Sequence, residues 1–591
     1  MKKRARLLPV SAVILLIALA LWGCGDMSML TALKAKEIAA NTVAQPVFSP
    51  VAGVYSTAQT VNISTTTAGA TIRYTTDGST PTSTTGTVYA ASISVTASET
   101  IKAIAYESGW TDSAVAAAAY SIGSSMPQAQ WAQVLATGTS GQASFNGVAV
   151  DSSGNGYAAG LATTTGTYGF GNSVTATTVS SQDNVLLVKY NSSGQAQWAQ
   201  TLTAGVYAEF QSVAVDSSGN VYAAGFDEGT GTYGFGNGVT TAGIATGVNL
   251  LLVKYNSSGQ AQWAQTLTAN ASGGAEYYGV AVDSSGNVYA AGYLGGTRAT
   301  YGFGNGVTAT MSSGSDGVLL VKYNSSGLAQ WAQTDTPTMT NAIAVFHGVA
   351  VDSAGNVYAA GYQDSSAEAF GNSVTATGAS AANNVLIVKY NSSGLAQWAQ
   401  TLTAAGTSAL FNGVAADSTG NVYAVGYVLG TGTYGFGNGV TAAGTASSGQ
   451  NVLLVKYNLS GQAQWAQTLT AGNDSALFNG VGVDTSGNIY AGGALISSGV
   501  GAYGFGNGVS ATGIPSASDI VLVKYNSLGQ AQWAQTLSSG NGGASFQGVA
   551  VDSTGTAFAA GSDNGSGASG FGNGVTVTTA AGGGNVLLVK Y

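Results

Sequence analysis

Few side chains in this sequence could carry out acid–base or nucleophilic chemistry. The chain has one histidine, His347, and one cysteine, Cys24, so a Ser/His/Asp triad has a single candidate base and no histidine or cysteine spacing suggests a metal. Paired carboxylates support glycoside cleavage in some enzymes, but no unit of the sequence places two unusual acids together. From these residues we expect no enzymatic activity, no bound metal and no cofactor.

A set of hydrogen-bonding side chains is the strongest candidate for a binding site. One unit of the sequence occurs seven times, and each copy has an amide, a phenol or an imidazole at the equivalent position of a strand-like run such as FNGVAVD. If these runs line a central channel, the side chains form a polar collar near its mouth, with Glu209 and Glu276 nearby. We expect this collar to bind a ligand; the alternative is a solvated rim that satisfies only local backbone groups. The collar residues are Asn146, Gln211, Tyr278, His347, Asn412, Asn479 and Gln547.

The collar belongs to a repeat array that fills residues 126–591. Tryptophans recur in it at intervals of 65 to 68 residues, and each unit contains four strand-like runs, FNGVAVD, GNVYAAG, NVLLVKY and QAQWAQTL. A DSSGN turn joins the first two runs and an NSSG turn joins the last two, and both suit tight antiparallel hairpins. Four-stranded antiparallel sheets repeated seven times predict a seven-bladed β-propeller.

The two ends of the array predict that the ring closes. The array opens with a lone fourth run, residues 128–135, and stops at Tyr591 with a third run that lacks its fourth. Pairing of these two ends completes the last blade and leaves no free edge, whereas an open solenoid usually needs capping repeats. The units, with VAVDSSGNVY and VKYNSSG as their recognisable parts, resemble the bacterial beta-propeller repeat (SBBP type) of large exported proteins.

The recurrent residues of the unit are expected to be structural. We expect the tryptophans, such as Trp131, to pack between blades, with carbohydrate stacking as the alternative. The aspartate of each DSSGN turn, such as Asp151, is expected to accept its own backbone amides, because one carboxylate per turn falls far short of a calcium site. The lysine of each VKY motif, such as Lys189, is expected to extend into solvent.

Variation among the seven copies points to one face of the propeller. The DSSGN and NSSG turns hardly change, whereas the connections after the second and fourth runs differ in length and residue choice. These two connections emerge on the same face of an antiparallel blade. Because binding residues are often held on loops over a rigid scaffold, we expect the recognition site on this variable face.

The amino terminus predicts export and anchoring. Basic residues precede an apolar stretch that is short for a membrane span, and the sequence Leu21-Trp22-Gly23-Cys24 follows. This sequence resembles the lipobox of bacterial lipoproteins, which implies a signal peptide over residues 1–24 and a lipid on Cys24. An ordinary signal peptide or an uncleaved anchor is the alternative. Residues 25–43 are interpreted as a tether.

Residues 44–123 predict a small Ig/Fn3-like β-sandwich in front of the propeller. Alternating runs such as TVNIST and ETIKAIAYE are broken by turn clusters such as DGSTP. The string IRYTTDGSTPT, followed by TVYAASISVTASETIKAIAYESG, resembles the Fn3-like domain at the carboxyl end of chitobiases and β-hexosaminidases. That resemblance implies a spacer or accessory module. The fold class expected for the whole chain is therefore all-β.

The composition of the chain limits the classes of partner that it can bind. Charged residues make up 7% of the chain, the net charge is −9, and from residue 126 onward 8 Lys and Arg face 19 Asp and Glu. Nucleic acid is excluded as a partner because phosphate binding needs clustered cations. We expect an exported lipoprotein, held on a membrane of the bacterial cell envelope, that binds a glycan or protein or acts as a scaffold. The alternatives are an extracellular carbohydrate-active enzyme and a purely structural envelope repeat protein.

Overall fold

The computed structural model of the 591-residue chain is all β in the residues that it describes. The predicted signal peptide (1–24) with Cys24, and most of the predicted tether (25–43), lie outside these residues. In the described part of the chain, no helix is long and apolar enough to cross a membrane. The chain divides into two compact units, Met1–Met126 and Pro127–Tyr591. The described residues are 42–50, 53–55, 58–122, 128–136, 142–269, 273–296, 299–311, 316–337, 339, 342–404, 406–496, 501–514, 518–540, 542–579 and 584–591.

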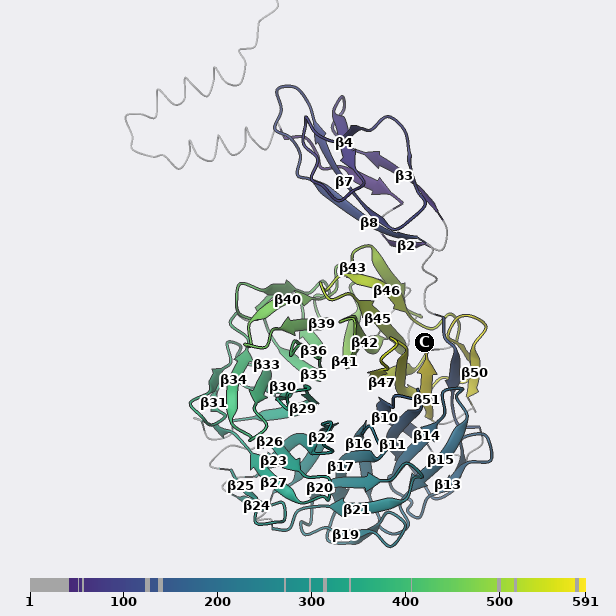
Figure 1. Cartoon of the computed structure of the whole chain (residues 1–591), viewed down its shortest axis with the longest axis vertical. Coiled ribbons are helices and arrows are strands. Elements are labelled where there is room, and N and C mark those ends of the chain that lie inside the picture. Colours follow the sequence, from purple (N-terminus) through teal and green to yellow (C-terminus); the bar gives the residue numbers. More distant parts are fainter. Residues whose placement is uncertain are drawn as a thin grey trace, which may run out of the picture. The chain divides into compact units, whose positions relative to one another are not determined.

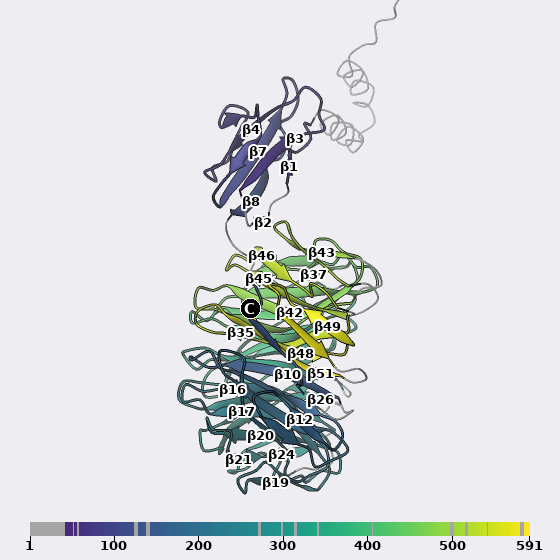
Figure 2. The same cartoon turned by 90° about the vertical axis from the view of Figure 1, so that its right-hand side faces the viewer.

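The first unit is a small β-sandwich, which confirms the predicted Ig/Fn3-like fold. One sheet has the strand order β2-β8-β7-β4-β5 and the other the order β1-β3-β6 (Figure 2). Alternating residues of these strands face inward, so Val61 from one sheet and Ile101 and Tyr120 from the other share one core. The strands are β1 (Val47–Ser49), β2 (Gly53–Tyr55), β3 (Gln59–Ser64), β4 (Thr71–Thr75), β5 (Thr87–Val88), β6 (Ile93–Val95), β7 (Glu99–Tyr106) and β8 (Ala116–Ile122).

The second unit contains seven four-stranded antiparallel sheets in its described residues, arranged in a ring (Figure 1). We call them blades 1 to 7 in chain order. Blade 1 is β10 (Ala143–Val150), β11 (Gly156–Ala162), β14 (Asn184–Tyr190) and β15 (Ala196–Thr201); blade 2 is β16 (Ala208–Val215), β17 (Val221–Glu228), β20 (Val248–Tyr255) and β21 (Ala261–Gln265); blade 3 is β22 (Ala275–Val282), β23 (Val288–Gly295), β26 (Asp316–Tyr323) and β27 (Ala329–Gln333); blade 4 is β29 (Ala344–Val351), β30 (Val357–Gln363), β33 (Asn384–Tyr390) and β34 (Ala396–Thr401). Blade 5 is β35 (Ala409–Ala416), β36 (Val422–Leu429), β39 (Gln450–Tyr457) and β40 (Ala463–Gln467); blade 6 is β41 (Ser475–Val483), β42 (Ile489–Ile496), β45 (Ser518–Tyr525) and β46 (Ala531–Gln535); blade 7 is β47 (Ala544–Val551), β48 (Ala557–Asp563), β51 (Asn585–Lys590) and β9 (Trp131–Gln133).

The ring closes as the sequence predicts. The first strand of each blade contacts the first strands of both neighbours, and β47 contacts β10, so the cycle is complete. Within blade 7, β9 pairs antiparallel with β51, with Trp131 opposite Lys590 and Ala132 opposite Val589. The first strand of the array therefore completes the last sheet, and the predicted β-propeller is confirmed.

The recurrent tryptophan and lysine join neighbouring blades through one carbonyl. Trp263 Nε1 and Lys254 Nζ, both of blade 2, donate to the Ser325 carbonyl oxygen of blade 3 at 3.2 and 3.1 Å. Lys254 Nζ also lies 5.2 Å from the centre of the Tyr222 ring, a cation–π distance. The expected packing role of the tryptophans is confirmed. The expectation that the lysines extend into solvent is wrong, because aromatic rings and carbonyls hold them between blades.

The same contact is formed where the ring closes. Trp131 Nε1 and Lys590 Nζ of blade 7 donate to the Ser192 carbonyl oxygen of blade 1 at 3.1 and 3.0 Å. Gly194 of that turn has a φ of 80°, and a Cβ added to it would lie 2.7 Å from Trp131 Cδ2. Only glycine fits between the turn and the indole.

Each unit also contains a short hairpin around its FGN motif, in addition to the four strands of the blade. The runs on either side of the FGN motif pair, as β12 does with β13, and the buried Phe170 follows the first of them. Asn172 adopts a φ of 50°, and its Nδ2 donates to the Ala196 carbonyl oxygen of the fourth strand at 2.9 Å. The hairpins are β12 (Thr167–Gly169) and β13 (Thr175–Thr177), β18 (Thr232–Gly234) and β19 (Thr240–Ala242), β24 (Thr300–Gly302) and β25 (Thr308–Thr310), β31 (Ala367–Ala369) and β32 (Thr375–Thr377), β37 (Thr433–Gly435) and β38 (Thr441–Ala443), β43 (Ala502–Gly506) and β44 (Val509–Thr512), and β49 (Gly567–Gly570) and β50 (Thr576–Thr579).

The aspartate of each DSSGN turn organises that turn, as predicted. Asp151 Oδ1 accepts the backbone amides of Ser153 and Asn155, and Oδ2 accepts Asn155 Nδ2 and the Tyr157 hydroxyl, at 2.8 to 3.0 Å. Partial burial acts to raise the pKa of Asp151, but these hydrogen bonds outweigh it and hold the pKa below its ordinary value. Both oxygens of the Asp151 carboxylate thus accept hydrogen bonds from residues of the turn and the strand that follows it.

Substitution of Gly194 by alanine tests the closing contact. Gly154→Ala is the matched control: Gly154 also has a positive φ, of 74°, but a Cβ there would lie 3.6 Å from its nearest neighbour. Both variants carry the left-handed backbone cost of about 1–2 kcal/mol. Gly194→Ala should lose a further ~1–3 kcal/mol through overpacking against Trp131. Denaturant unfolding measures both losses, and equal losses would mean that the indole does not constrain the turn.

Candidate functional site

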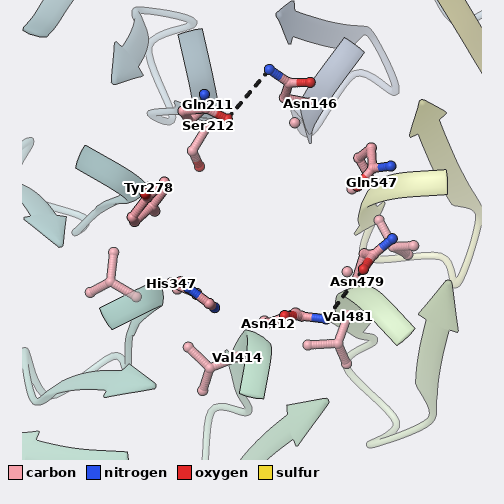
Figure 3. Close-up of a pocket in the computed structure, with 18 of the residues that line it drawn as sticks. Asn146, Gln211, Ser212, Tyr278, His347, Asn412, Val414, Asn479, Val481 and Gln547 are labelled. Carbon is pink, nitrogen blue, oxygen red and sulfur yellow. Dashed lines mark hydrogen bonds between the residues drawn. The ribbon is translucent and has the colours of Figure 1, made fainter. Parts of the chain in front are cut away.

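The seven collar residues line one cavity at the centre of the ring. They surround a volume of about 170 Å³ together with the glycines and valines that follow them in the same strands (Figure 3). Six of the seven are half-buried, and Gln547 is exposed. The structure therefore brings together all the residues singled out from the sequence: Asn146, Gln211, Tyr278, His347, Asn412, Asn479 and Gln547.

A β-bulge places each collar side chain in the cavity. In β10 the register with β11 shifts between Phe145 and Gly147, so Asn146 is the extra residue, and the other six first strands repeat this shift. A bulge re-aims its extra side chain away from the regular alternation. Close packing of the inner strands explains the glycine that follows it in most copies: a Cβ on Gly279 would lie 3.0 Å from the Gly348 Cα of the next blade.

Four collar side chains bind the next blade. Asn146 Nδ2 donates to the Phe210 carbonyl oxygen at 3.0 Å, Asn412 Nδ2 to that of Phe478 and Asn479 Nδ2 to that of Phe546, both at 2.9 Å. His347 Nδ1 lies 3.1 Å from the Phe411 carbonyl oxygen. These four side chains thus satisfy backbone groups, as the alternative interpretation of the collar expects.

The other three collar side chains turn to residues two positions earlier in their own strands. Gln211 Nε2 donates to Glu209 Oε2 at 3.2 Å, and Gln547 Nε2 donates to Ser545 Oγ at 3.1 Å. Tyr278 donates a hydrogen bond to Glu276. The two glutamates named with the collar therefore contact it directly.

Aromatic and acidic side chains contact the collar in blades 2 to 4. Tyr278 stacks on Tyr293 with ring centres 5.9 Å apart. The His347 ring makes T-shaped contacts with the rings of Tyr278 and Tyr362, with ring centres 5.4 Å apart in each pair. We define the acidic–aromatic arc as Glu209, Glu276, Tyr278, Tyr293, His347 and Tyr362, from blades 2 to 4. At the positions of Tyr293 and Tyr362, blades 6, 7 and 1 carry the small or aliphatic residues Ala494, Ser562 and Leu161.

Tyr293 and Tyr362 are not among the site residues predicted from the sequence, although the sequence carries a signal for them. They stand at the end of the second strand, opposite Glu276 and Val345 of the first strand. Comparison of the seven units at this position finds aromatic residues in blades 2 to 5 alone. The collar position hides this asymmetry because it is polar in every unit.

Burial shifts the acid–base behaviour of the arc. It raises the pKa of Glu276 to about 7; the Glu209 carboxylate adds to the rise and the hydrogen bond from Tyr278 opposes it. Burial likewise raises the pKa of Glu209 to about 7, against a hydrogen bond from Tyr207 and with the Asp183 carboxyl adding to the rise. Carboxyl groups with such pKa values can both donate and accept a proton near neutral pH.

Burial also lowers the pKa of His347, against the opposing effect of the Phe411 carbonyl. The imidazole is therefore neutral near pH 7. Because a carbonyl oxygen only accepts hydrogen bonds, the proton of the neutral ring lies on Nδ1, which leaves the Nε2 lone pair as an acceptor. The arc thus combines two carboxyls, a phenol and a neutral imidazole.

Comparisons with known proteins identify part of the chain. Residues 50–117 match the family model of the chitobiase/beta-hexosaminidase C-terminal domain, which confirms the resemblance of that segment. No curated protein matches the chain.

Several solved structures resemble the chain at low identity. A PL25 polysaccharide lyase, an ulvan lyase, is 10% identical, with 69% of this chain and 97% of that chain covered and a TM-score of 0.31. Rhamnogalacturonan lyase YesW is 14% identical, with 83% and 89% covered and a TM-score of 0.26. A GH43_12 protein retrieved from capybara gut metagenome is 9% identical, with 79% and 100% covered and a TM-score of 0.23.

These structures correct one expectation. The sequence alone suggests that the chain is not an enzyme, because its single histidine and scattered acids form no recognisable catalytic set. The structures that resemble it include polysaccharide lyases, so that expectation is wrong. The acids and aromatic rings of the arc come from different blades, so the sequence separates them by about one repeat and shows no catalytic set.

The raised pKa of Glu276 predicts a pH dependence of stability. The folded state keeps the proton between the ordinary pKa of 4.5 and the folded value of about 7, so stability falls as the pH rises through that window. A shift of this size corresponds to about 3 kcal/mol. Glu276→Gln, which does not titrate, should lose less stability than the wild type between pH 5 and pH 8 in denaturant unfolding. Glu228→Gln, at an exposed position of the same mouth region, is the control and should behave like the wild type.

Proposed function

We propose that the chain is an exported carbohydrate-active enzyme that binds a polysaccharide across the mouth of the propeller channel and cleaves it at the acidic–aromatic arc. The observation that carries the proposal is the arc itself, in which half-buried tyrosines and two carboxyls with raised pKa values contact the collar residues Gln211, Tyr278 and His347. The remaining blades supply polar collar residues without this combination.

Polysaccharide binding fits the mixture of groups in the arc. The apolar faces of a sugar ring stack on aromatic side chains, and its hydroxyls bind carboxylates and amides. Tyr293 and Tyr362 supply partly exposed rings, and Gln211, Gln547 and Asn412 supply amides from around the cavity. A pocket for a small apolar ligand would have a drier and less polar lining.

Acid–base catalysis fits the two glutamates. Glycosidic cleavage needs one carboxylic acid that protonates the leaving oxygen and a second, ionised carboxylate. Glu276 and Glu209 lie in neighbouring blades, and the Glu209 carboxylate adds to the rise in the pKa of Glu276, so Glu276 can hold a proton near neutral pH. We assign the proton donor to Glu276, because its Tyr278 neighbour also belongs to the collar and reaches the cavity.

The lack of positive charge around the cavity favours binding of a neutral polysaccharide over a charged one. No lysine or arginine is among the residues that line the cavity. Lysines of the VKY motifs are held between blades by carbonyls and rings, as Lys389 is by the Leu459 carbonyl oxygen at 3.3 Å. A sulfate or uronate group would therefore meet carboxyls without a compensating cation.

Export and anchoring are part of the same proposal. The lipobox-like sequence ending at Cys24 and the resemblance of the repeats to the SBBP-type repeat of exported proteins both support it. A lipid on Cys24 would hold the enzyme on the cell envelope, where it would come into contact with polysaccharides.

Activity of purified protein on a panel of polysaccharides tests the catalytic proposal. We expect product release from at least one neutral polysaccharide and none from alginate or sulfated polymers. Glu276→Gln should lower kcat by about 100-fold or more, as loss of a general acid does. Tyr362→Ala should mainly raise KM through lost stacking.

Glu228→Gln again serves as the control and should keep full activity. The proposal fails if folded wild-type protein cleaves nothing on the panel, or if Glu276→Gln cleaves as fast as the wild type.

Labelled palmitate tests the anchor. Cells that express the chain should label the wild type and not Cys24→Ser, because no other cysteine is present. Equal labelling of both, or of neither, would remove the lipid from the proposal without affecting the propeller site.

A further inference from the structure

The interface between blades 3 and 4 departs from the other six in two positions at once. Four residues after the recurrent tryptophan, six units have leucine and one has Asp335. Two residues before the recurrent phenylalanine, five units have tyrosine, one has serine and one has Glu368. In most of the other interfaces both positions are apolar and buried, as Leu267 and Tyr301 are.

The two acids lie together inside this interface. Asp335 is 3% exposed and Glu368 is 0% exposed. The short strand β28 (Thr336–Pro337), directly after Asp335, pairs with β31, with Pro337 opposite Glu368. The two carboxyl groups interact directly, and burial together with Glu368 raises the pKa of Asp335. A leucine–tyrosine contact has thus been replaced by a contact between two acids.

Oxygen atoms around the pair are left without partners. Ser366 Oγ binds Glu368 Oε1, whereas Glu368 Oε2 is buried and receives no hydrogen bond from an N–H or hydroxyl donor in the described residues, so the Asp335 carboxyl group is left as its polar neighbour. Gln363 is 0% exposed, and its Nε2 donates to the Ser366 and Ala376 carbonyl oxygens at 3.1 and 3.3 Å. Ala376 is the cross-strand partner of Glu368, so the Gln363 amide lies beside the acids, and its Oε1 is also buried without a partner.

Burial of such a cluster of acids lowers the stability of the folded protein unless a positive charge is also present. Each buried carboxylate loses its hydration, and two side by side repel each other. Buried unpaired oxygens add to the cost. A hard divalent cation removes both penalties, and carboxylate and amide oxygens without nitrogen or sulfur donors are the ligands that calcium prefers.

We propose that Asp335, Glu368 and Gln363 form a calcium-type cation site that joins blades 3 and 4 beneath the variable face. The remaining coordination positions fall to backbone carbonyls and water. Gln363 directly follows Tyr362 of the acidic–aromatic arc, so the cation also steadies one wall of the mouth. The site is independent of the proposed catalytic function.

The test uses the full chain without its signal peptide, stripped with EDTA and then titrated with calcium. We expect one calcium per chain by elemental analysis and a rise of several degrees in Tm. In the double variant Asp335→Leu/Glu368→Tyr, which restores the residues of the other units, we expect a folded protein whose Tm does not respond to calcium.

Asp563→Asn is the control for loss of a buried acid elsewhere, because both Asp563 oxygens already accept hydrogen bonds from Gly565 and Ser569. It should keep the full calcium response. The proposal is overturned if the stripped wild type binds no calcium, or if calcium raises the Tm of the double variant as much as that of the wild type. A wild-type Tm that responds to acidification and not to calcium would identify a shared proton in place of the cation.

Discussion

Pairing of β9 with β51 is the interaction on which the second unit depends. It gives blade 7 its fourth strand, and it brings Trp131 and Lys590 to the Ser192 carbonyl, the contact that also joins blades 2 and 3. Because the closing interface repeats the internal ones, blade 7 is a complete four-stranded sheet like the other six in the described residues. The first strands are then held around one cavity, and their seven bulges place the collar side chains in it.

Periodicity made much of this structure predictable. Four runs per unit, tight turns between them and complementary ends were enough to predict the sheets, the closure and the seven residues around the cavity. The recurring Trp131 and Asp151 positions were also assigned their packing and turn roles correctly. These features depend on local turn chemistry and on alternation of apolar residues, which a sequence displays directly.

Features that depend on contacts between units could not be predicted in the same way. The hairpins around FGN have strands of only a few residues, too short for a periodic signal. The lysines have an ordinary solvent-facing pattern, and only the neighbouring turn carbonyl and tyrosine ring hold them inside. Glu276, Tyr293 and His347 come from two blades, so their proximity and the resulting pKa shifts appear only in three dimensions.

Repetition also shows where the chain has specialised. Most positions of the unit are constant because each blade must fit two neighbours, so a departure at a buried position needs compensation in the adjacent blade. Asp335 and Glu368 depart together across one interface, and aromatic residues stand near the end of the second strand in blades 2 to 5 alone. Asp335 follows the fourth strand of blade 3, and Tyr293 and Tyr362 lie near the ends of second strands, next to connections that vary among the units. The constant face carries the turns that maintain the ring.

Disulfide trapping in a Cys24→Ser background tests ring closure most directly. Ala132 and Val589 are opposite each other in β9 and β51, and the equivalent pair within blade 6 is Ala534 and Val523. If the ring closes, cysteines at 132 and 589 should form an intramolecular disulfide as readily as cysteines at 534 and 523, whereas cysteines at 132 and 523 should form none. Failure of the 132–589 pair to form in monomeric protein, while the 534–523 pair forms, would contradict the closed ring and with it the shared cavity.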